Sequence, residues 1–208
     1  MQRKEIIQKL INETNAKSYV EIGLGDGKLF QEIECQKKYG IDPQYEDYVF
    51  SKGTECDIEP THKMTSDEFF KQNEEKFDII FIDGMHDRHH VERDINNSLK
   101  VLNDKGFIVC HDMNPTSKKM QKVPRRQLVW TGNCWKAWVK IRSKNPNINM
   151  CVVDTDYGCG IIKKGKQELL DLEGLKIKWS NFKINRKKWL NLITVEEFLN
   201  KTYCTEKI

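Results

Sequence analysis

A glycine-rich turn between a predicted strand and a predicted helix is the feature that most constrains how this 208-residue chain folds. Residues 19–30 read Y-V-E-I-G-L-G-D-G-K-L-F, with apolar residues before the glycines and a helical pattern after them. Glycine permits positive φ and lets a ligand approach the backbone closely. The N-terminus of the following helix presents free N–H groups. The segment therefore predicts a nucleotide-binding turn, against the alternative of a plain surface loop.

The spacing of the glycines indicates which kind of nucleotide is bound. A dinucleotide fingerprint requires G-x-G-x-x-G, but Lys28 occupies the position of its third glycine. The residues instead follow E-x-G-x-G-x-G, formed by Glu21, Gly23, Gly25 and Gly27. The pattern therefore disfavours a dinucleotide site and keeps a carboxylate two residues before the first glycine.

Two features further along the chain favour a nucleotide site over a surface loop. Asp42 ends a predicted strand at 38–42 and follows Gly23 by 19 positions. An acid at about this offset hydrogen-bonds the ribose hydroxyls in nucleotide-binding βαβ units. The run F-D-I-I-F-I-D-G at 77–84 suits a central strand buried on both faces, and it too ends in an acid, Asp83.

Length and cysteine content set the expected class of protein. We expect residues 1–208 to form a single domain, because this length buries a sizeable core without covalent staples. No run of 18 apolar residues is present, which predicts no membrane span. The N-terminal residues are too charged for a signal peptide. Seven cysteines without a C-x-x-C pair fit a reducing, cytoplasmic location.

The charge is distributed unevenly along the chain. Residues 1–112 hold 15 Lys and Arg against 23 Asp and Glu, whereas residues 113–208 hold 20 against 8. The excess of lysine is either ordinary solvated surface or a basic rim that attracts an anionic acceptor. Five basic residues fall in the segment expected beside the active site, namely Lys118, Lys119, Lys122, Arg125 and Arg126.

Strand and helix patterns alternate through most of the chain. Predicted strands lie at 18–23, 38–42, 61–65, 77–83, 107–112, 149–154 and 157–163, and predicted helices at 3–15, 27–37, 66–75, 88–103, 133–143 and 195–202. The loop 113–131 is long for a connection, which is typical of a lid or substrate loop. The order predicts an α/β fold with a doubly wound, mostly parallel sheet that finishes in an antiparallel hairpin.

Several longer motifs resemble a compact group of class I S-adenosylmethionine (SAM) methyltransferases. They are F-D-I-I-F-I-D-G-M-H, R-D-I-N-N-S-L-K-V-L-N-D-K-G-F-I-V-C-H-D-M-N-P, W-T-G-N-C-W-K-A-W, V-D-T-D-Y-G-C-G-I-I and N-R-K-K-W-L-N-L-I. The group is similar to the sugar and macrolide-glycoside O-methyltransferases. The resemblance implies a Rossmann-like seven-stranded methyltransferase sheet, SAM as the cofactor, and a hydroxyl of a sugar in a glycan or glycoside as the acceptor. Residues 165–208 would form a C-terminal extension packed on the domain.

The resemblance also assigns cofactor-binding residues. Gly23, Gly25 and Gly27 would line the methionine and ribose parts of SAM. Glu21 would anchor the glycine turn or the cofactor's amino group, and Asp42 would bind the ribose hydroxyls.

Four further positions complete the predicted cofactor site. Thr65, Ser66 and Asp67 match the place where the family meets adenine; the alternative is that they only cap a helix. Asp83, at the end of the central strand, is also expected to line the cofactor.

The expected chemistry requires a base or a metal. Methyl transfer from a sulfonium is an in-line displacement, and a sugar hydroxyl is a poor nucleophile at neutral pH. Candidate groups follow two predicted strands whose carboxyl ends meet at the ligand crevice of such a sheet, namely Asp83, His86, His111 and Asp112. His86 is the preferred base because imidazole titrates near neutral pH, and His111 is the second candidate.

A metal site is predicted from the same cluster. In metal-dependent sugar methyltransferases, one carboxylate after strand four and a pair of acids after strand five hold a divalent cation. Asp83 and Asp112 match two of these positions, whereas His111 replaces the third and Met85 stands where that subgroup keeps a catalytic aspartate. Oxygen ligands suit Mg²⁺, and an added imidazole shifts the preference toward Mn²⁺.

Neighbouring His and Trp residues have simpler interpretations. His89 and His90 are expected to be exposed at the start of a helix. Trp135 and Trp138 have the spacing of core residues on one helix face, whereas Trp130 is a candidate wall for a sugar ring.

Two alternative functions remain at this stage. A nucleic-acid (RNA) methyltransferase would suit the basic second half, but the N-P-P-Y motif of base amino-methylases is missing, and Asn114-Pro115 is the nearest match. A SAM-fold scaffold without catalysis would not need to keep the glycine turn together with Asp42.

Overall fold

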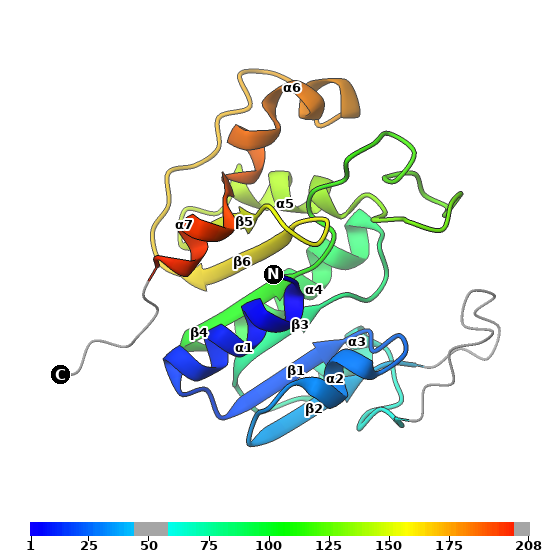
Figure 1. Cartoon of the computed structure of the whole chain (residues 1–208), viewed down its shortest axis with the longest axis vertical. Helices are drawn as coiled ribbons and strands as arrows, with labels where there is room; N and C mark the ends of the chain where they lie inside the picture. Colours follow the sequence, from blue (N-terminus) through cyan, green and yellow to red (C-terminus); the bar gives the residue numbers. More distant parts are fainter. Residues whose placement is uncertain (44–57, 202–208) are drawn as a thin grey trace.

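The computed structural model of the chain describes residues 1–43 and 58–201. One seven-stranded sheet runs through the molecule in the order β2-β1-β3-β4-β6-β5-β7 (Figure 1). The first four strands in this order are parallel, β6 is antiparallel to both β4 and β5, and β7 is parallel to β5. The strands are β1 (Ser18–Ile22), β2 (Lys37–Ile41), β3 (Phe77–Ile82), β4 (Leu102–Cys110), β5 (Ile148–Val153), β6 (Cys159–Lys164) and β7 (Leu192–Ile193).

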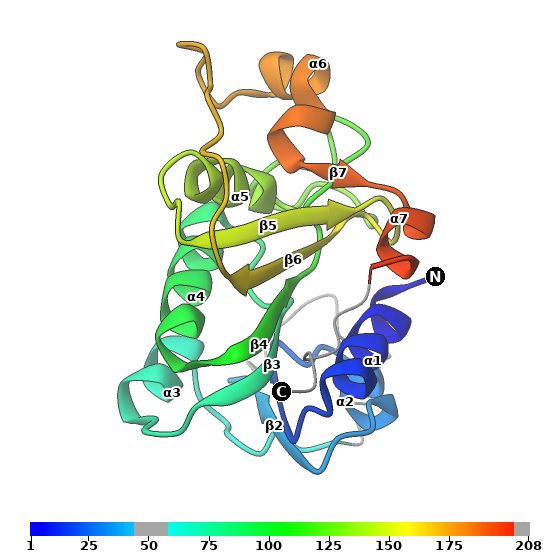
Figure 2. The same ribbon diagram turned by 90° about the vertical axis from the view of Figure 1, so that its left-hand side faces the viewer.

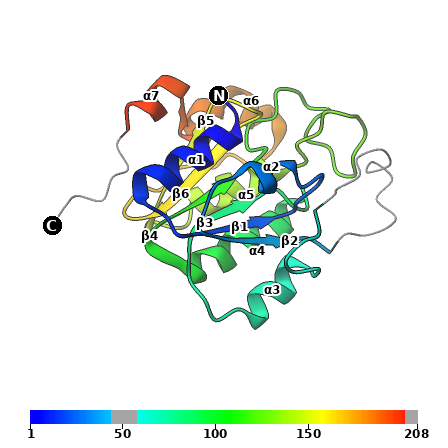
Figure 3. The same ribbon diagram turned by 60° about the horizontal axis from the view of Figure 1, so that its bottom comes forward.

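Helices cover both faces of this sheet (Figure 3). Alternate residues of the central strands therefore face two different cores: Ile80 packs with the helices of one face, and Phe81 with those of the other. This arrangement explains why β3 reads as a continuous apolar run. One face carries α1 (Arg3–Thr14), α2 (Lys28–Glu32) and α7 (Val195–Leu199), and the other carries α3 (Ser66–Gln72), α4 (Arg88–Val101), α5 (Cys134–Arg142) and α6 (Trp179–Leu190).

The predicted Rossmann-like sheet of seven strands is confirmed, but one of its strands lies at the opposite edge from the one expected. Residues 61–65, which are all described, form a single bridge between Ile41 and His62 instead of a strand. The side chain of Thr61 accepts the hydrogen bond from the N–H of Gly40 that a continuing strand would have taken. The seventh strand is β7, which pairs with β5.

Several other boundaries also differ from the prediction, and those of α2 and β4 differ by five residues each. Helix α2 stops at Glu32 instead of 37, since the Lys38 ammonium donates to the carbonyls of Phe30 and Ile33 and the chain turns into β2. Strand β4 begins at Leu102, directly after α4, instead of at 107.

Helix α6 was not predicted, because its apolar residues do not follow a regular helical period. Its Phe182 ring stacks on Trp135 of α5 at 4.1 Å between centroids, and Trp138 donates to the Leu190 carbonyl. Figure 2 shows α6 beside α5 and next to β7. Trp135 and Trp138 are completely buried, which confirms their prediction as core residues. Among the described residues, no helix has the length and apolar character needed to cross a bilayer.

Candidate active site

The glycine turn and the turn after β3 touch each other at the carboxyl edge of the sheet. Gly23, Gly25 and Gly27 all have positive φ, at 85°, 56° and 70°. A Cβ at Gly23 would lie 2.5 Å from the Cα of Gly84, so only glycine allows this approach. The predicted cofactor turn therefore lies directly against the turn that follows Asp83.

Asp42 holds the glycine turn from the neighbouring strand. Its carboxylate accepts a hydrogen bond from the backbone N–H of Leu24 at 2.9 Å. Gly23 in turn donates to the carbonyl of Ile41 at 2.9 Å. The structure thus brings Asp42 and the glycines together at one site.

Glu21 is buried and has a different partner from the one expected. The Tyr19 hydroxyl donates to its carboxyl group at 2.5 Å, and it is Asp42 that anchors the glycine turn. Burial raises the pKa of Glu21 to about 8, against the opposite effect of the Tyr19 hydrogen bond. A contact between Glu21 and the cofactor's amino group stays a prediction.

Thr65, Ser66 and Asp67 have the structural roles of the helix-cap alternative. Thr65 forms a capping box with Glu68 at the start of α3. Ser66 donates to the buried Asp94 at 2.6 Å, and Asp67 pairs with Arg93 of α4 at 2.8 Å. A contact with adenine stays a prediction for these three residues.

The predicted acids and histidines of the strand ends meet in one cluster. The N–H of Asp83 donates to the Ile22 carbonyl, and that of His111 to the Ile82 carbonyl, so the three strands end side by side. His86 Nε2 lies 3.3 Å from Asp83, and His86 Nδ1 lies 3.0 Å from Asp112. Buried His86 Nδ1 has no partner in hydrogen-bonding geometry among the described residues. The imidazole of His86 therefore stands between two carboxylates.

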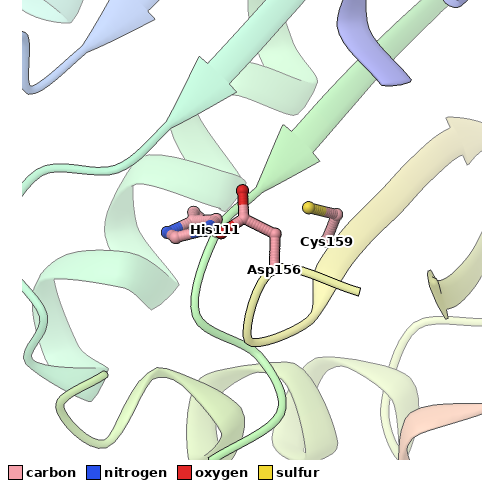
Figure 4. A group of neighbouring side chains, drawn as sticks. All are labelled: His111, Asp156 and Cys159. Atoms are coloured by element: carbon pink, nitrogen blue, oxygen red, sulfur yellow. Dashed lines mark ion pairs between the residues drawn. The ribbon is translucent and has the colours of Figure 1, made fainter. Parts of the chain in front are cut away.

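Two further residues, which could not be identified as site residues from the motifs, also belong to this cluster. Arg3, at the start of α1, lies with its Nη1 2.7 Å from His111 Nε2. Asp156, in the turn between β5 and β6, lies 3.4 Å from the same nitrogen. Figure 4 shows His111, Asp156 and Cys159 gathered between the end of β4 and the start of β6. The signal for Asp156 was available, because a strand antiparallel to β4 must begin where β4 ends.

The charges in this cluster shift the titration of its members. Burial opposes the charged forms, but Asp112 and Asp83 raise the pKa of His86 to about 10. The pKa of His111 is likewise raised against burial, chiefly by Asp83. The pKa of Asp83 is depressed despite its burial, mainly by the charge of His111, and that of Asp156 falls to about 2. The acids around them therefore favour the protonated form of both imidazoles, although the Arg3 guanidinium, which can only donate, lies 2.7 Å from His111 Nε2.

The segment 130–133 fixes His86 in place. The Trp130 ring stacks on the His86 ring, with centroids 5.0 Å apart and planes at 12°. Gly132 has φ +58°, and a Cβ there would lie 1.8 Å from the His86 carbonyl oxygen. Asn133 donates to the same oxygen at 3.1 Å. The W-T-G-N motif at 130–133 therefore supports the ring and backbone of His86. The same contacts place the end of the predicted substrate loop, 113–131, beside His86.

Two sets of side chains have ligand atoms close enough to hold a metal ion. Asp83, His86 and Asp112 present theirs within 4.8 Å of one another, and so do His111, Asp156 and Cys159. Burial raises the pKa of the Cys159 thiol to about 12, so that thiol is protonated. The first set offers two carboxylates and the unpartnered Nδ1 of His86, which fits an ion that takes oxygen and imidazole ligands.

The remaining histidines and the exposed Met85 lie outside the cluster. His89 is exposed and His90 is half-buried in the first turn of α4, where Asp87 caps the helix by accepting from the His89 N–H. Met85 is 53% exposed at the position where the metal-dependent subgroup has an acid.

Comparisons with known proteins agree with this architecture. Residues 20–113 match the model of a family described as a methyltransferase domain. No curated protein matches the chain significantly. A Klebsiella pneumoniae protein described as an O-methyltransferase aligns with a TM-score of 0.57 and 13% identity, covering 78% of this chain and 80% of the other.

Two ligand-bound structures are similar to the same extent. An O-methyltransferase of Bacillus cereus bound to SAH aligns with a TM-score of 0.53 and 13% identity, covering 77% of this chain and 79% of the other. The O-methyltransferase TomG of Streptomyces achromogenes, bound to SAM, aligns with a TM-score of 0.56 and 11% identity, covering 78% and 79%. At these identities the likeness shows the fold. Residues 20–113 thus match a methyltransferase-domain family, and the chain has the fold of these O-methyltransferases.

Proposed function

We propose that this protein transfers the methyl group of SAM to a hydroxyl oxygen of a sugar in a glycan or glycoside. One observation carries the choice of oxygen chemistry: a histidine lies between two carboxylates directly beside the glycine turn. Such a cluster can take the proton of a hydroxyl, which a neutral sugar cannot release unaided. The sugar itself is supported by the motif resemblance alone.

SAM would bind across the carboxyl ends of β1, β2 and β3. Asp42 lies at the carboxyl end of β2, where its carboxylate accepts from Leu24 of the glycine turn, and an acid at this place in a βαβ unit suits the ribose hydroxyls. The glycine turn lets the methionine part approach the backbone. The positive sulfonium would lie toward Asp83, and when bound it supplies the methyl group.

His86 is the proposed base, with Asp112 as the group that orients its ring. In the ligand-free protein the two carboxylates keep His86 protonated. A positive sulfonium beside Asp83 opposes that protonation, because like charges disfavour one another. His111 is more enclosed, with its ring nitrogens facing Arg3 and three acids, and it is better placed to hold Asp83 than to meet an acceptor.

Asp83 and Asp112 are the proposed ligands of a Mg²⁺ or Mn²⁺ ion. Bound there, the ion would neutralise the two acids and polarise the acceptor hydroxyl. The ligand atoms of Asp83, His86 and Asp112 lie within 4.8 Å of one another, and this closeness supports the site.

Labelled methyl transfer tests this function. The purified chain, incubated with methyl-labelled SAM, is offered a panel of mono- and oligosaccharides, small phenols and a short RNA. We expect label in the sugar fraction as an alkali-stable ether. Label only in RNA would establish the nucleic-acid alternative, and SAM binding without transfer to any acceptor would establish the scaffold alternative.

A further inference from the structure

A pocket of about 720 Å³ opens on the loop between β4 and α5, and cationic side chains line it. We call it the basic pocket and define it by Lys119, Lys122 and Arg126, with Val123 and Gln127 completing the wall. All three cations are exposed. Within the described part of the chain, no carboxylate lies within ion-pair distance of any of them.

The sequence around the basic pocket provides no internal counter-charge. Between Asp112 and Asp154 the chain has nine Lys and Arg residues and not one Asp or Glu. Surface lysines elsewhere in this protein do find acids, as Lys140 does with Glu92 and Lys188 with Glu173. Among residues 1–43 and 58–201, the cations of the basic pocket therefore have no paired acid, and their positive potential attracts anions.

The backbone that carries the basic pocket is held by its own hydrogen bonds. The Trp130 indole N–H donates to the Lys122 carbonyl at 2.5 Å, and Thr131 N–H donates to the Met120 carbonyl at 3.1 Å. The Arg125 guanidinium donates to the carbonyls of Gln127 and Leu128. A pocket with a fixed backbone binds its ligand at a lower entropic cost.

Trp130 joins the basic pocket to the proposed base. Its indole nitrogen contacts the Lys122 backbone, and its ring stacks on His86. Trp130 thus contacts both the backbone of the basic pocket and the proposed base. In the reacting cluster, by contrast, the basic groups of His86, His111 and Arg3 already lie within ion-pair distance of Asp83, Asp112 and Asp156, so the cluster offers an anion no unpaired cation.

We propose that the basic pocket binds an anionic substituent of the acceptor, a phosphate or carboxylate carried on the sugar, while a hydroxyl of the same molecule lies at His86. This inference rests on the proposed function and names the acceptor class more narrowly. Lys and Arg bind such oxyanions through charge-assisted hydrogen bonds, and separating the anion site from the acidic cluster sets the orientation of the acceptor.

Calorimetry on the SAH-saturated full chain tests the proposal with glucose 6-phosphate, glucose and inorganic phosphate as probes. We expect glucose 6-phosphate to bind at least roughly tenfold more tightly than either of the others at low salt, because two to three charge-assisted contacts add to those of the ring. The variant K119Q/K122Q/R126Q should lose this preference. The matched variant K166Q/K176Q/K183Q removes three exposed cations far along the sequence and should keep it.

Several results would overturn the inference. One is that the K119Q/K122Q/R126Q variant keeps the wild-type preference for glucose 6-phosphate. Another is that the wild type binds glucose and glucose 6-phosphate equally well, or binds neither. A third is that the wild type binds inorganic phosphate as tightly as glucose 6-phosphate. Tighter binding of a short RNA than of glucose 6-phosphate would replace the sugar with a nucleic acid. Melting temperatures and SAH affinities of both variants exclude misfolding as the cause. A wild type that fails to bind SAH would instead contradict the proposed function itself.

Discussion

At the scale of residues, three buried or half-buried carboxylates lie among three basic side chains. Asp83, Asp112 and Asp156 lie among His86, His111 and Arg3, within the distances of ion pairs. Removing one partner from such a group leaves a buried charge uncompensated. The free-energy cost of that charge exceeds the stabilisation that the intact pair provides. For substitutions in this cluster, both the stability and the activity of the variant therefore have to be measured.

His86→Ala should lower kcat by about 10²–10⁴-fold, the usual range for a general base. SAH affinity should change little, because the lost interaction belongs to the transition state. Steady-state kinetics and calorimetry measure the two effects. His89→Ala is the matched control, since His89 is exposed in the next helical turn and should leave both values unchanged. A loss of kcat in His111→Ala but not in His86→Ala would move the base to the end of β4.

Chelation tests the role of Asp83 and Asp112 as ligands. Excess EDTA should abolish methyl transfer, and added Mn²⁺ or Mg²⁺ should restore it, because a bound cation would neutralise both acids and polarise the acceptor. Asp112→Asn should respond weakly to added metal. Full activity in EDTA would leave these acids as charge partners of the histidines only.

Glu21 predicts a pH dependence of stability. Its folded pKa of about 8 lies above the ordinary value of 4.5, so its contribution is complete below about pH 4.5 and is lost as the pH rises through about 8. Glu21→Gln cannot ionise and still offers an acceptor to Tyr19. Between pH 5 and 9 the melting temperature of the Glu21→Gln variant should therefore fall less than that of the wild type. At pH 9 the difference should correspond to roughly 3–5 kcal/mol in the free energy of unfolding. If the melting temperatures of the two proteins changed equally with pH, the fold would not raise the pKa of Glu21.

Much of the site at this scale could be predicted from the sequence. Asp83, His86, His111 and Asp112 follow two apolar runs, and parallel strands end at one edge, so their meeting follows from topology. Arg3 could not be predicted in this way, because only the packing of α1 against the sheet brings its side chain to His111. The raised pKa of His86 depends on two partners at once, and its residue type alone indicates a value near neutrality.

At the scale of elements, the turn 130–133 is the support on which His86 depends. Gly132→Ala would place a Cβ 1.8 Å from the His86 carbonyl, so the backbone of one of the two turns must shift. We expect a loss of kcat of at least roughly tenfold, since small displacements of a catalytic group have large effects. Gly174→Ala is the matched control: it has φ +72°, but its Cβ would meet no atom within 4 Å. Equal kinetics in the two variants would show that the contact with His86 is not needed.

The elements themselves were predictable where burial is regular. The strands β1, β3, β5 and β6 follow apolar runs, and both faces of the sheet are covered, so the pattern is clear. Residues 61–65 have a single apolar residue, Met64, and make one bridge instead of a strand, because the side chain of Thr61 takes the hydrogen bond of Gly40. Helix α6 and β7 are specified by tertiary contacts with Trp135 and β5, which no local window contains.

At the scale of the whole molecule, segments distant in sequence converge on the carboxyl edge of the sheet. The start of α1 reaches the β5–β6 turn, where Thr155 donates to the Met1 carbonyl and Asp156 accepts from Arg3 N–H. The site therefore draws on residues from position 3 to position 156. We keep the proposal that residues 1–208 act as one domain, with residues 165–208 as an extension that contributes α6 and β7.

The proposed function requires that the glycine turn and Asp42, at the carboxyl edge of the sheet, bind the cofactor. Isothermal titration of SAH into the wild type, Asp42→Ala and Asp78→Ala tests this most directly. Asp78 is the matched control, because it also accepts backbone N–H groups, those of Lys17 and Ser18, but at the opposite end of β1. We predict 1:1 binding to the wild type and to Asp78→Ala, and a loss of about 1.5–3 kcal/mol in Asp42→Ala. A wild type that gives no heat with SAH, or an Asp42→Ala variant that binds as tightly, would contradict the account.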